Sequence, residues 1–114
     1  MVELKRLKSY LLMQMIDYAP KTTITRYIVS KETGYVTISA HDKGVNINAK
    51  VLAFEKLIQI IDGVAEVNID DNTIQLKAGQ IFLIPANSPN TIKANERFKM
   101  ITTIIKSGYE EVNI

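Results

Sequence analysis

From Lys21 onward, apolar and polar residues alternate in short runs, and a turn signal follows almost every run. Residues 35–41, for example, alternate Val, Ile and Ala with Thr, Ser and His. Successive side chains of a strand point to opposite faces, so a period of two is typical of half-buried strands. No helical pattern interrupts these runs, which disfavours a parallel α/β sheet and predicts an all-β sandwich or barrel.

The alternation predicts about nine short strands separated by turns. Asp62-Gly63 is the strongest turn signal and predicts a hairpin, because this dipeptide suits tight hairpin turns. Residues 85–89 contain two prolines and predict a loop, and the tail over residues 107–114 is expected to fray or to pair with a neighbouring strand. The expected strands cover residues 22–30, 35–41, 47–51, 55–61, 65–69, 73–76, 80–84, 90–94 and 97–106.

The first 20 residues follow a different period. Apolar residues recur there at steps of three and four, which is typical of an amphipathic helix, and Pro20 is expected to end it. We therefore expect a helical extension over residues 1–20 that packs its apolar stripe onto a barrel formed by residues 21–114. The stripe consists of Leu4, Leu7, Leu11, Met15 and Tyr18.

Composition limits the chemistry of the chain. Its 114 residues suffice for one domain, and its formal net charge is only +2. The absence of cysteine excludes disulfides, thiolate metal sites and cysteine nucleophiles, and a single histidine nearly excludes a site built from several imidazoles.

No feature of the sequence points to a membrane or to nucleic acid. The apolar runs are far shorter than the ~20 residues of a spanning helix, and the N-terminus lacks the cleavage site of an export signal. Lys5, Arg6 and Lys8 form the only cluster of bases near the N-terminus, next to Glu3, and no basic stripe recurs. We expect a cytoplasmic protein that binds neither nucleic acid nor membranes.

The segment from Gly79 to Asn90 resembles the second motif of the cupins, a family of small jelly-roll barrels. Gly79 and Pro85 keep the spacing of that motif, and the run Pro85-Ala86-Asn87-Ser88-Pro89 is similar to a loop of small single-domain cupins. In the family a metal-binding histidine follows this loop, whereas this chain has Asn90. Asp42-Lys43-Gly44 resembles a turn of the same proteins. The resemblance implies a jelly-roll barrel of two antiparallel sheets with a short N-terminal helix.

The same resemblance implies that the metal site of the family has been replaced. Carried over residue by residue, the ligand positions hold Asn48, Lys50, Lys56 and Asn90. An ammonium group has no lone pair to donate to a metal ion, so we expect no metal and no other cofactor. A register shifted by one residue would bring Glu55 into the pocket instead of Lys56, and one carboxylate with two amides is still a poor transition-metal site.

Lys50 is the most informative of these residues. Its ammonium could bind a carboxylate, phosphate or sugar oxygen, or it could pair with Glu55 or extend out of the barrel mouth. A desolvated Lys50 could also act as a base or a nucleophile. Lys56 is expected to be solvated or paired, because an unpaired buried ammonium is costly.

His41 has two interpretations. Beside Asp42 it could act as a general base, as in metal-free sugar epimerases of the wider cupin group, or it could lie partly exposed before a turn. Asn48 and Asn90 keep the capacity to hydrogen-bond a ligand. Further possible pocket residues are Tyr27, Tyr35, Thr37, Gln59 and Thr102, whereas Phe82, Phe98 and Met100 are expected in the core.

The sequence thus supports three hypotheses for function. The first is a metal-independent module that binds a small polar or anionic metabolite through Lys50, Asn90, Asn48, Glu55 and His41. The second is a metal-free isomerase or lyase that uses Lys50, His41 or Glu55, and the third is a barrel with only an assembly role. Strands with apolar residues on both faces further predict a homodimer.

Overall fold

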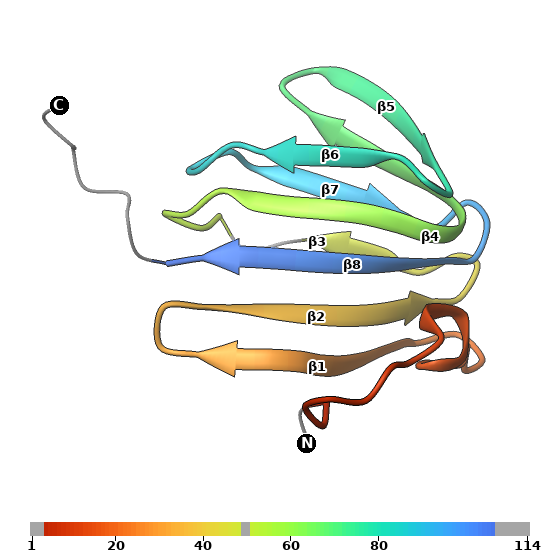
Figure 1. The fold of residues 1–114 in the computed structure, drawn as a ribbon. Coiled ribbons are helices and arrows are strands. Elements are labelled where there is room, and N and C mark those ends of the chain that lie inside the picture. Colours follow the sequence, from red (N-terminus) through yellow and green to blue (C-terminus); the bar gives the residue numbers. More distant parts are fainter. Residues whose placement is uncertain (1–3, 49–50, 107–114) are drawn as a thin grey trace, which may run out of the picture.

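The chain folds into antiparallel strands that form two sheets (Figure 1). The computed structural model describes residues 4–48 and 51–106. The strands in this part of the chain are β1 (Thr23–Lys31), β2 (Gly34–His41), β3 (Asn46–Asn48), β4 (Lys56–Ile69), β5 (Asn72–Lys77), β6 (Ile81–Ile84), β7 (Asn90–Lys93) and β8 (Phe98–Ile105).

Sheet A has the strand order β1-β2-β8-β4-β6, and sheet B has the order β3-β7-β4-β5. β4 belongs to both sheets: its first part pairs with β6 and β8, and its second part pairs with β5 and β7. The sheets curl around a common interior, as Figure 1 shows. The expected all-β jelly roll of two antiparallel sheets is confirmed.

The hairpin predicted at Asp62-Gly63 is wrong, because β4 continues through both residues. The register against β8 shifts between Ile60 and Asp62, and Gly63 has a φ of 75°. A β-carbon on Gly63 would lie 2.0 Å from the carbonyl oxygen of Arg97. The glycine therefore serves a bulge that bends the strand from one sheet into the other, and it makes room for the neighbouring backbone.

An apolar core fills the interior beside sheet B and the middle of β4. Phe98 and Met100 belong to it, and Phe82 packs against it, as predicted. The strand alternation directs these side chains inward from both sheets. The buried members are Ile58, Ile60, Ala65, Val67, Ile69, Leu76, Ile84, Ile92, Ala94, Phe98 and Met100.

The helix predicted over residues 1–20 is wrong in its extent: residues 4–20 contain only a short 3₁₀ helix, Leu12–Gln14. Sheet partners take the backbone groups that a helix would use. The backbone N–H of Leu4 donates to the carbonyl of Ile28, and Lys99 Nζ donates to the carbonyl of Met13 at 2.9 Å. A short isolated helix is marginal in water, so these tertiary contacts decide the conformation.

The predicted packing of the apolar stripe is borne out only in part: Met15 is buried and Leu4 and Tyr18 pack beside it, whereas Leu7 and Leu11 are exposed. Met15 and Ile16 are buried against Ile38 and Ala40, on the outer face of sheet A. The N-terminal segment thus covers part of an outward face that would otherwise be apolar and exposed. No helix in the described part of the chain is long and apolar enough to cross a membrane.

Candidate functional site

The most polar part of the interior lies along β1, β2 and β8. Five hydroxyl side chains line a cavity there, and we call them the hydroxyl cluster: Thr23, Thr25, Thr37, Ser39 and Thr102. One hollow of about 430 Å³ includes the whole cluster and reaches β3, and a second of about 310 Å³ shares Thr25, Thr37 and Thr102 with it. The two hollows adjoin and lie within the size range of small-molecule sites, and the wall of the larger one also carries the apolar side chains of Val45, Ile47 and Met100.

The sequence pattern of β2 explains why this cavity is polar. The period of two turns Thr37, Ser39 and His41 inward, while Ile38 and Ala40 face outward beneath the N-terminal segment. The strand is therefore buried on both faces, with its polar face toward the interior. Its outward apolar face needed a cover, and the N-terminal segment provides one.

His41 lies at the end of the hydroxyl cluster and is only 2% exposed. The prediction of a partly exposed histidine is therefore wrong, because its ring stacks on Phe98 at 4.6 Å between centroids. Thr23 Oγ1 lies 2.8 Å from Nδ1 and Ser39 Oγ lies 2.7 Å from Nε2. Asp42 accepts a hydrogen bond from the backbone N–H of Lys21 and does not orient the imidazole.

These two hydrogen bonds define what His41 does. Burial lowers its pKa from 6.5 to about 4, so the ring is neutral at pH 7. A neutral imidazole has one donor and one acceptor nitrogen, so one of the two hydroxyls accepts from the ring and the other donates to it. The hydroxyl that accepts keeps its own proton for another partner. His41 thus orients Thr23 and Ser39, and both of its nitrogens are already engaged.

Lys56 is the charged side chain at the other end of the cavity. It is half-buried, opposite Ile104 of β8 and Ile84 of β6, and it lines the smaller hollow with Tyr27 and Tyr35. Burial lowers the pKa of Lys56. No ion pair between Lys56 and another described residue is found, and the expectation that this lysine is solvated or paired stays a prediction. Its ammonium is the only charged group among the described residues that line the two hollows.

Asn90 presents a buried acceptor close to Lys56. It is 9% exposed and begins β7 with its side chain on the buried face. Its Nδ2 donates to the carbonyl of Ser88 at 3.0 Å, whereas its Oδ1 is buried and has no partner among the described residues. Lys56 and Asn90 line one further small hollow of about 10 Å³. A buried acceptor without a donor is rare in folded proteins, and it is best explained by a ligand or a water.

The structure distributes the other predicted site residues differently. Asn48 is exposed and is one of the residues that line the larger hollow. Glu55 is exposed, just before β4, and lines none of the described cavities. Lys50 lies outside the described residues. Among the further pocket residues predicted, Tyr27, Tyr35, Thr37 and Thr102 line the cavity, while Gln59 is exposed on the opposite face.

Sequence reasoning missed Thr23, Thr25 and Ser39. Thr23 and Thr25 share the period of two with Tyr27, so a known inward face for β1 would have identified them. Alternation alone does not show which face of β1 points inward. The opposite face carries Ile24, Arg26 and Ile28, and the arginine makes it a poor guide to the apolar side of the strand.

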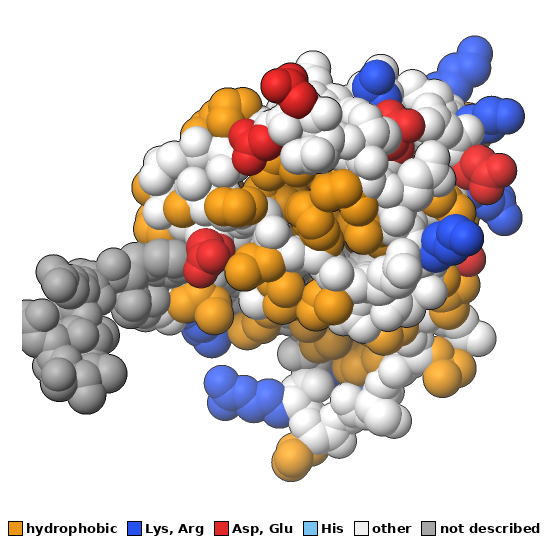
Figure 2. Space-filling model, turned by 90° about the horizontal axis from the view of Figure 1, so that it is seen from above, with side chains coloured by type: hydrophobic (Ala, Val, Ile, Leu, Met, Phe, Trp, Pro, Cys, Tyr) orange, Lys and Arg blue, Asp and Glu red, His pale blue; other side chains and the backbone are white. Residues whose placement is uncertain are grey.

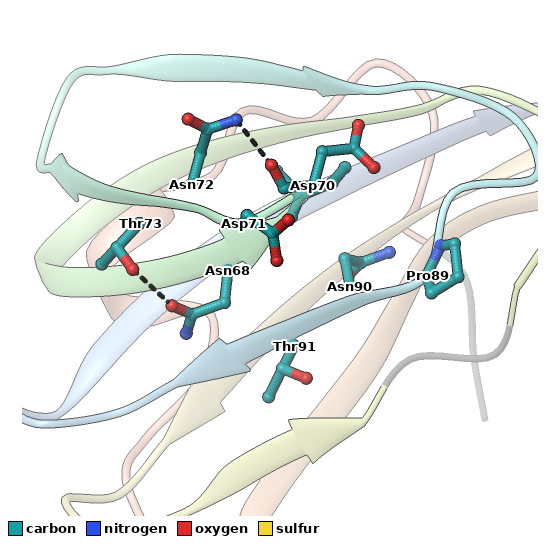
Figure 3. A pocket seen from close by; sticks show the side chains of 9 residues that line it. Asn68, Asp70, Asp71, Asn72, Thr73, Pro89, Asn90 and Thr91 are labelled. Atoms are coloured by element: carbon teal, nitrogen blue, oxygen red, sulfur yellow. Dashed lines mark hydrogen bonds between the residues drawn. The ribbon is translucent and has the colours of Figure 1, made fainter.

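Another hollow, of about 400 Å³, lies outside the interior at the tip of the β4–β5 hairpin (Figure 3). Two of its polar groups are satisfied locally: Thr73 Oγ1 donates to Asn68 Oδ1 at 2.8 Å, and Asn72 Nδ2 donates to the carbonyl of Asp70 at 3.0 Å. Figure 3 shows that Asn90 lies between this hairpin and Pro89, so it borders both this hollow and the interior. The local hydrogen bonds favour a structural role for the hairpin and leave the interior as the candidate site.

The donor set of the interior does not fit a metal ion. No group of three or more histidine, aspartate or glutamate side chains with ligand geometry occurs in the part of the chain that the structure describes. The two described residues at the inner end are an ammonium and an amide, and an ammonium repels a divalent cation. We therefore derive no chemistry through a metal.

Comparisons with known proteins match a family model over most of the chain and several solved structures of the same fold. Residues 32–102 match the family model described as the AraC-like ligand binding domain. The match contains β2 to β7 and most of β8, and with them Thr37, Ser39, His41, Lys56 and Asn90. A search of curated proteins finds no significant match.

Solved structures show the same fold. A conserved protein of unknown function from Streptococcus pyogenes is 26% identical, with a TM-score of 0.85 and coverage of 92% of each chain. A cupin superfamily protein from Desulfitobacterium hafniense is 18% identical, with a TM-score of 0.85 over 91% of this chain and 95% of that one. A cupin 2 conserved barrel domain protein from Leptotrichia buccalis is 21% identical, with a TM-score of 0.87 over 93% of this chain and 51% of that one.

Proposed function

Because the chain belongs to the family of AraC-like ligand-binding domains, which have the cupin fold, we propose that it binds a small polar or anionic metabolite in its interior without a metal ion. The observation that carries the proposal is the pairing of an unsatisfied buried acceptor with a half-buried ammonium. Asn90 Oδ1 and Lys56 line the same hollow at the inner end of the hydroxyl cluster. Each needs a polar partner, and a bound metabolite supplies both.

The cost of these groups supports a binding role. A buried polar atom without a hydrogen bond costs about 1–3 kcal/mol, and an ammonium partly removed from water costs more. Apolar residues of similar size would avoid both costs. Retained polar groups of this kind are typical of sites where stability is given up for recognition.

A metal-free isomerase or lyase is less well supported. Such an enzyme needs a base with a pKa near the working pH, and the pKa of His41 is about 4. Both ring nitrogens of His41 are bonded to hydroxyls, and Glu55 is exposed. A purely structural role is disfavoured as well, because hollows of about 430 and 310 Å³ leave the interior open.

A thermal-shift screen of metabolites, combined with elemental analysis of the purified protein, tests the proposal. We expect substoichiometric iron, manganese, nickel and zinc, and a rise in melting temperature with at least one small anion or polyol. Amide chemical shifts should move for Thr37, Thr102 and Asn90 in the same titration, which locates the ligand in the interior. A stoichiometric transition metal, or ligands that shift only surface residues, would contradict the proposal.

Asn48 and Lys50 also belong to this proposal, on the basis of the motif positions they occupy. The matched variants Lys50→Met and Asn48→Ala test them in the same screen. A loss of at least about threefold in affinity, the size expected for one hydrogen bond, would support a direct contact. Unchanged affinity in both variants would exclude them from the site.

We also propose that the chain forms a homodimer through the face that carries β6. Figure 2 shows hydrophobic side chains gathered in the middle of the face seen from above. On β6, Ile81 is 59% exposed and Leu83 is 49% exposed. Light scattering should give the mass of two chains, and Leu83→Lys should give one, whereas Ile24→Lys on the exposed edge strand should leave the dimer intact.

The proposed setting is a cytoplasmic protein, with neither nucleic acid nor a membrane among its partners. Its modest charge supports this, since 14 bases against 12 acids leave little attraction for a polyanion. Fractionation of cells would test the cytoplasmic location and the absence of a membrane partner. A nitrocellulose filter assay with duplex DNA at low salt would test the absence of DNA binding.

A further inference from the structure

The inner end of the cavity specifies the ligand more closely than its overall polarity. Lys56 Nζ is a donor with a positive charge, and Asn90 Oδ1 is an acceptor that needs a donor. Both residues line a hollow of about 10 Å³, which is about the volume that a single water or hydroxyl group requires. A group that fits both must place a negative acceptor on Lys56 and a hydroxyl donor beside it.

A carboxylate alone does not meet this requirement. Its oxygens are acceptors only when it is ionised, so an oxygen placed against Asn90 Oδ1 would bring two acceptors together. A hydroxyl on the carbon next to the carboxylate does meet it, because it carries a proton to donate and lies one bond beyond the charged group. The pair Lys56 and Asn90 is therefore complementary to a 2-hydroxycarboxylate.

The charge of the site favours a monoanion. Lys56 is the only charged side chain among the described residues lining the two larger hollows, and His41 is neutral at pH 7. A phosphate monoester carries a charge of about −1.5 to −2 at this pH. It would leave part of its charge unbalanced inside the barrel, which is costly.

The hydroxyl cluster specifies the remainder of the ligand. Thr25, Thr37 and Thr102 line the smaller hollow beside Lys56, and Thr23 and Ser39 continue the row toward His41. A hydroxyl side chain can donate and accept, and the imidazole leaves at least one of its two bonded hydroxyls with a proton to donate. A chain of ligand hydroxyl groups matches this row, whereas an alkyl chain would displace water from these hydroxyls without replacing its hydrogen bonds.

We propose that the interior recognises polyhydroxylated 2-hydroxy monocarboxylates of the sugar-acid class. The carboxylate accepts from Lys56 Nζ, the 2-hydroxyl donates to Asn90 Oδ1, and the chain hydroxyls bind the hydroxyl cluster. This inference rests on the proposed function and names the ligand class of the same site.

Calorimetric titration of the full chain with four probes tests the class without any variant. The probes are D-gluconate, 2-deoxy-D-gluconate, D-glucitol and inorganic phosphate. Gluconate is expected to bind tightest, 2-deoxygluconate about threefold to tenfold more weakly for one lost neutral hydrogen bond, and glucitol at least about tenfold more weakly for the lost charged one. Glucitol or phosphate binding as tightly as gluconate overturns the inference.

Three variants assign the roles. Lys56→Met is expected to lower gluconate affinity at least about tenfold, and Lys77→Met, which removes the same charge from an exposed position of β5, is expected to leave it unchanged. Asn90→Leu is expected to bind gluconate and 2-deoxygluconate equally. If Asn90→Leu still prefers gluconate, the 2-hydroxyl does not contact Asn90 and the inference fails.

The result also separates this inference from the proposed function. If another class of compound raises the melting temperature and shifts the amides of Thr37 and Thr102, while the four probes do not bind, the sugar-acid class is wrong and the binding function stands. If no compound binds in the interior, both are wrong.

Discussion

The two halves of the barrel interior contrast sharply. Beside sheet B the interior is filled by aliphatic and aromatic side chains, and most of them are fully buried. Along β1, β2 and β8 the same kind of strands turn hydroxyls, one imidazole and one ammonium inward around an open cavity. β4 takes part in both halves: its residues Ile58 and Ile60 pack in the core, and its first residue, Lys56, lines the cavity.

This contrast indicates a division of labour within one small barrel. The apolar half supplies the burial that holds the fold together, because apolar area removed from water is the main favourable term in folding. The polar half contributes less to the stability of the fold, and it contains buried polar groups that need a ligand. If this interpretation is correct, substitutions in the two halves should change the free energy of unfolding by different amounts and with different signs.

The largest effect is expected in the apolar half. Ile92 of β7 is fully buried, so Ile92→Ala should lower the free energy of unfolding by about 4 kcal/mol, the cost of lost burial and of the remaining cavity. Ile105→Ala at the end of β8 removes the same atoms at 57% exposure and should cost well under about 1 kcal/mol. Urea denaturation measures both. Similar losses for the two variants would show that the core does not carry the stability.

The next effect concerns the bend that joins the two halves. Gly63→Ala should destabilise the fold by about 3 kcal/mol, because the new β-carbon meets the carbonyl of Arg97 and the φ of 75° is strained for alanine. Gly44→Ala is the matched control: its φ is 90°, but nothing lies within 4 Å of the added atom. It should cost only about 1 kcal/mol. Equal losses would mean that the close approach at Gly63 is unimportant.

The third effect depends on pH and comes from the polar half. The pKa of His41 is 6.5 in the unfolded chain and about 4 in the folded protein, so between these values only the unfolded chain takes up the proton. Its contribution to stability is complete above about pH 7. It is lost as the pH falls from 6.5 to 4, by a total on the order of 3 kcal/mol.

His41→Asn isolates this contribution, since asparagine does not titrate in this range. The difference in unfolding free energy between the original protein and the variant should shrink steadily from pH 7 to pH 4. A difference that stays constant across this range would indicate that His41 titrates normally in the folded state.

The sequence also predicts the two halves to different extents. The period of two predicts the strands, and the Gly79–Pro85 spacing with the following loop predicts the family of folds. Both signals are local, because they come from alternation and from turn geometry. The same signals placed Phe82, Phe98 and Met100 in the core, where they lie.

The predictions that failed depended on contacts distant in sequence. The helical pattern of residues 1–20 was overridden by hydrogen bonds from Lys99 and to Ile28, and the Asp62-Gly63 turn was overridden by pairing with β8. The polar lining of β1 was missed for the same reason, since only the assembled sheet determines which face is inside. His41 looked like the end of an exposed strand because Phe98, which covers it, is far away in the chain.

The smallest expected effect has the opposite sign and tests the division of labour most directly. Lys56→Met replaces a half-buried ammonium by an uncharged side chain of similar length, which removes a desolvation cost without leaving a cavity. We expect the free energy of unfolding to rise by about 1 kcal/mol, in the absence of ligand, while binding in the interior is lost. Lys77→Met on the surface should change neither quantity. A Lys56→Met variant that is less stable than the original protein would show that this ammonium is paired within the fold, so that the polar half stabilises the barrel and does not await a ligand.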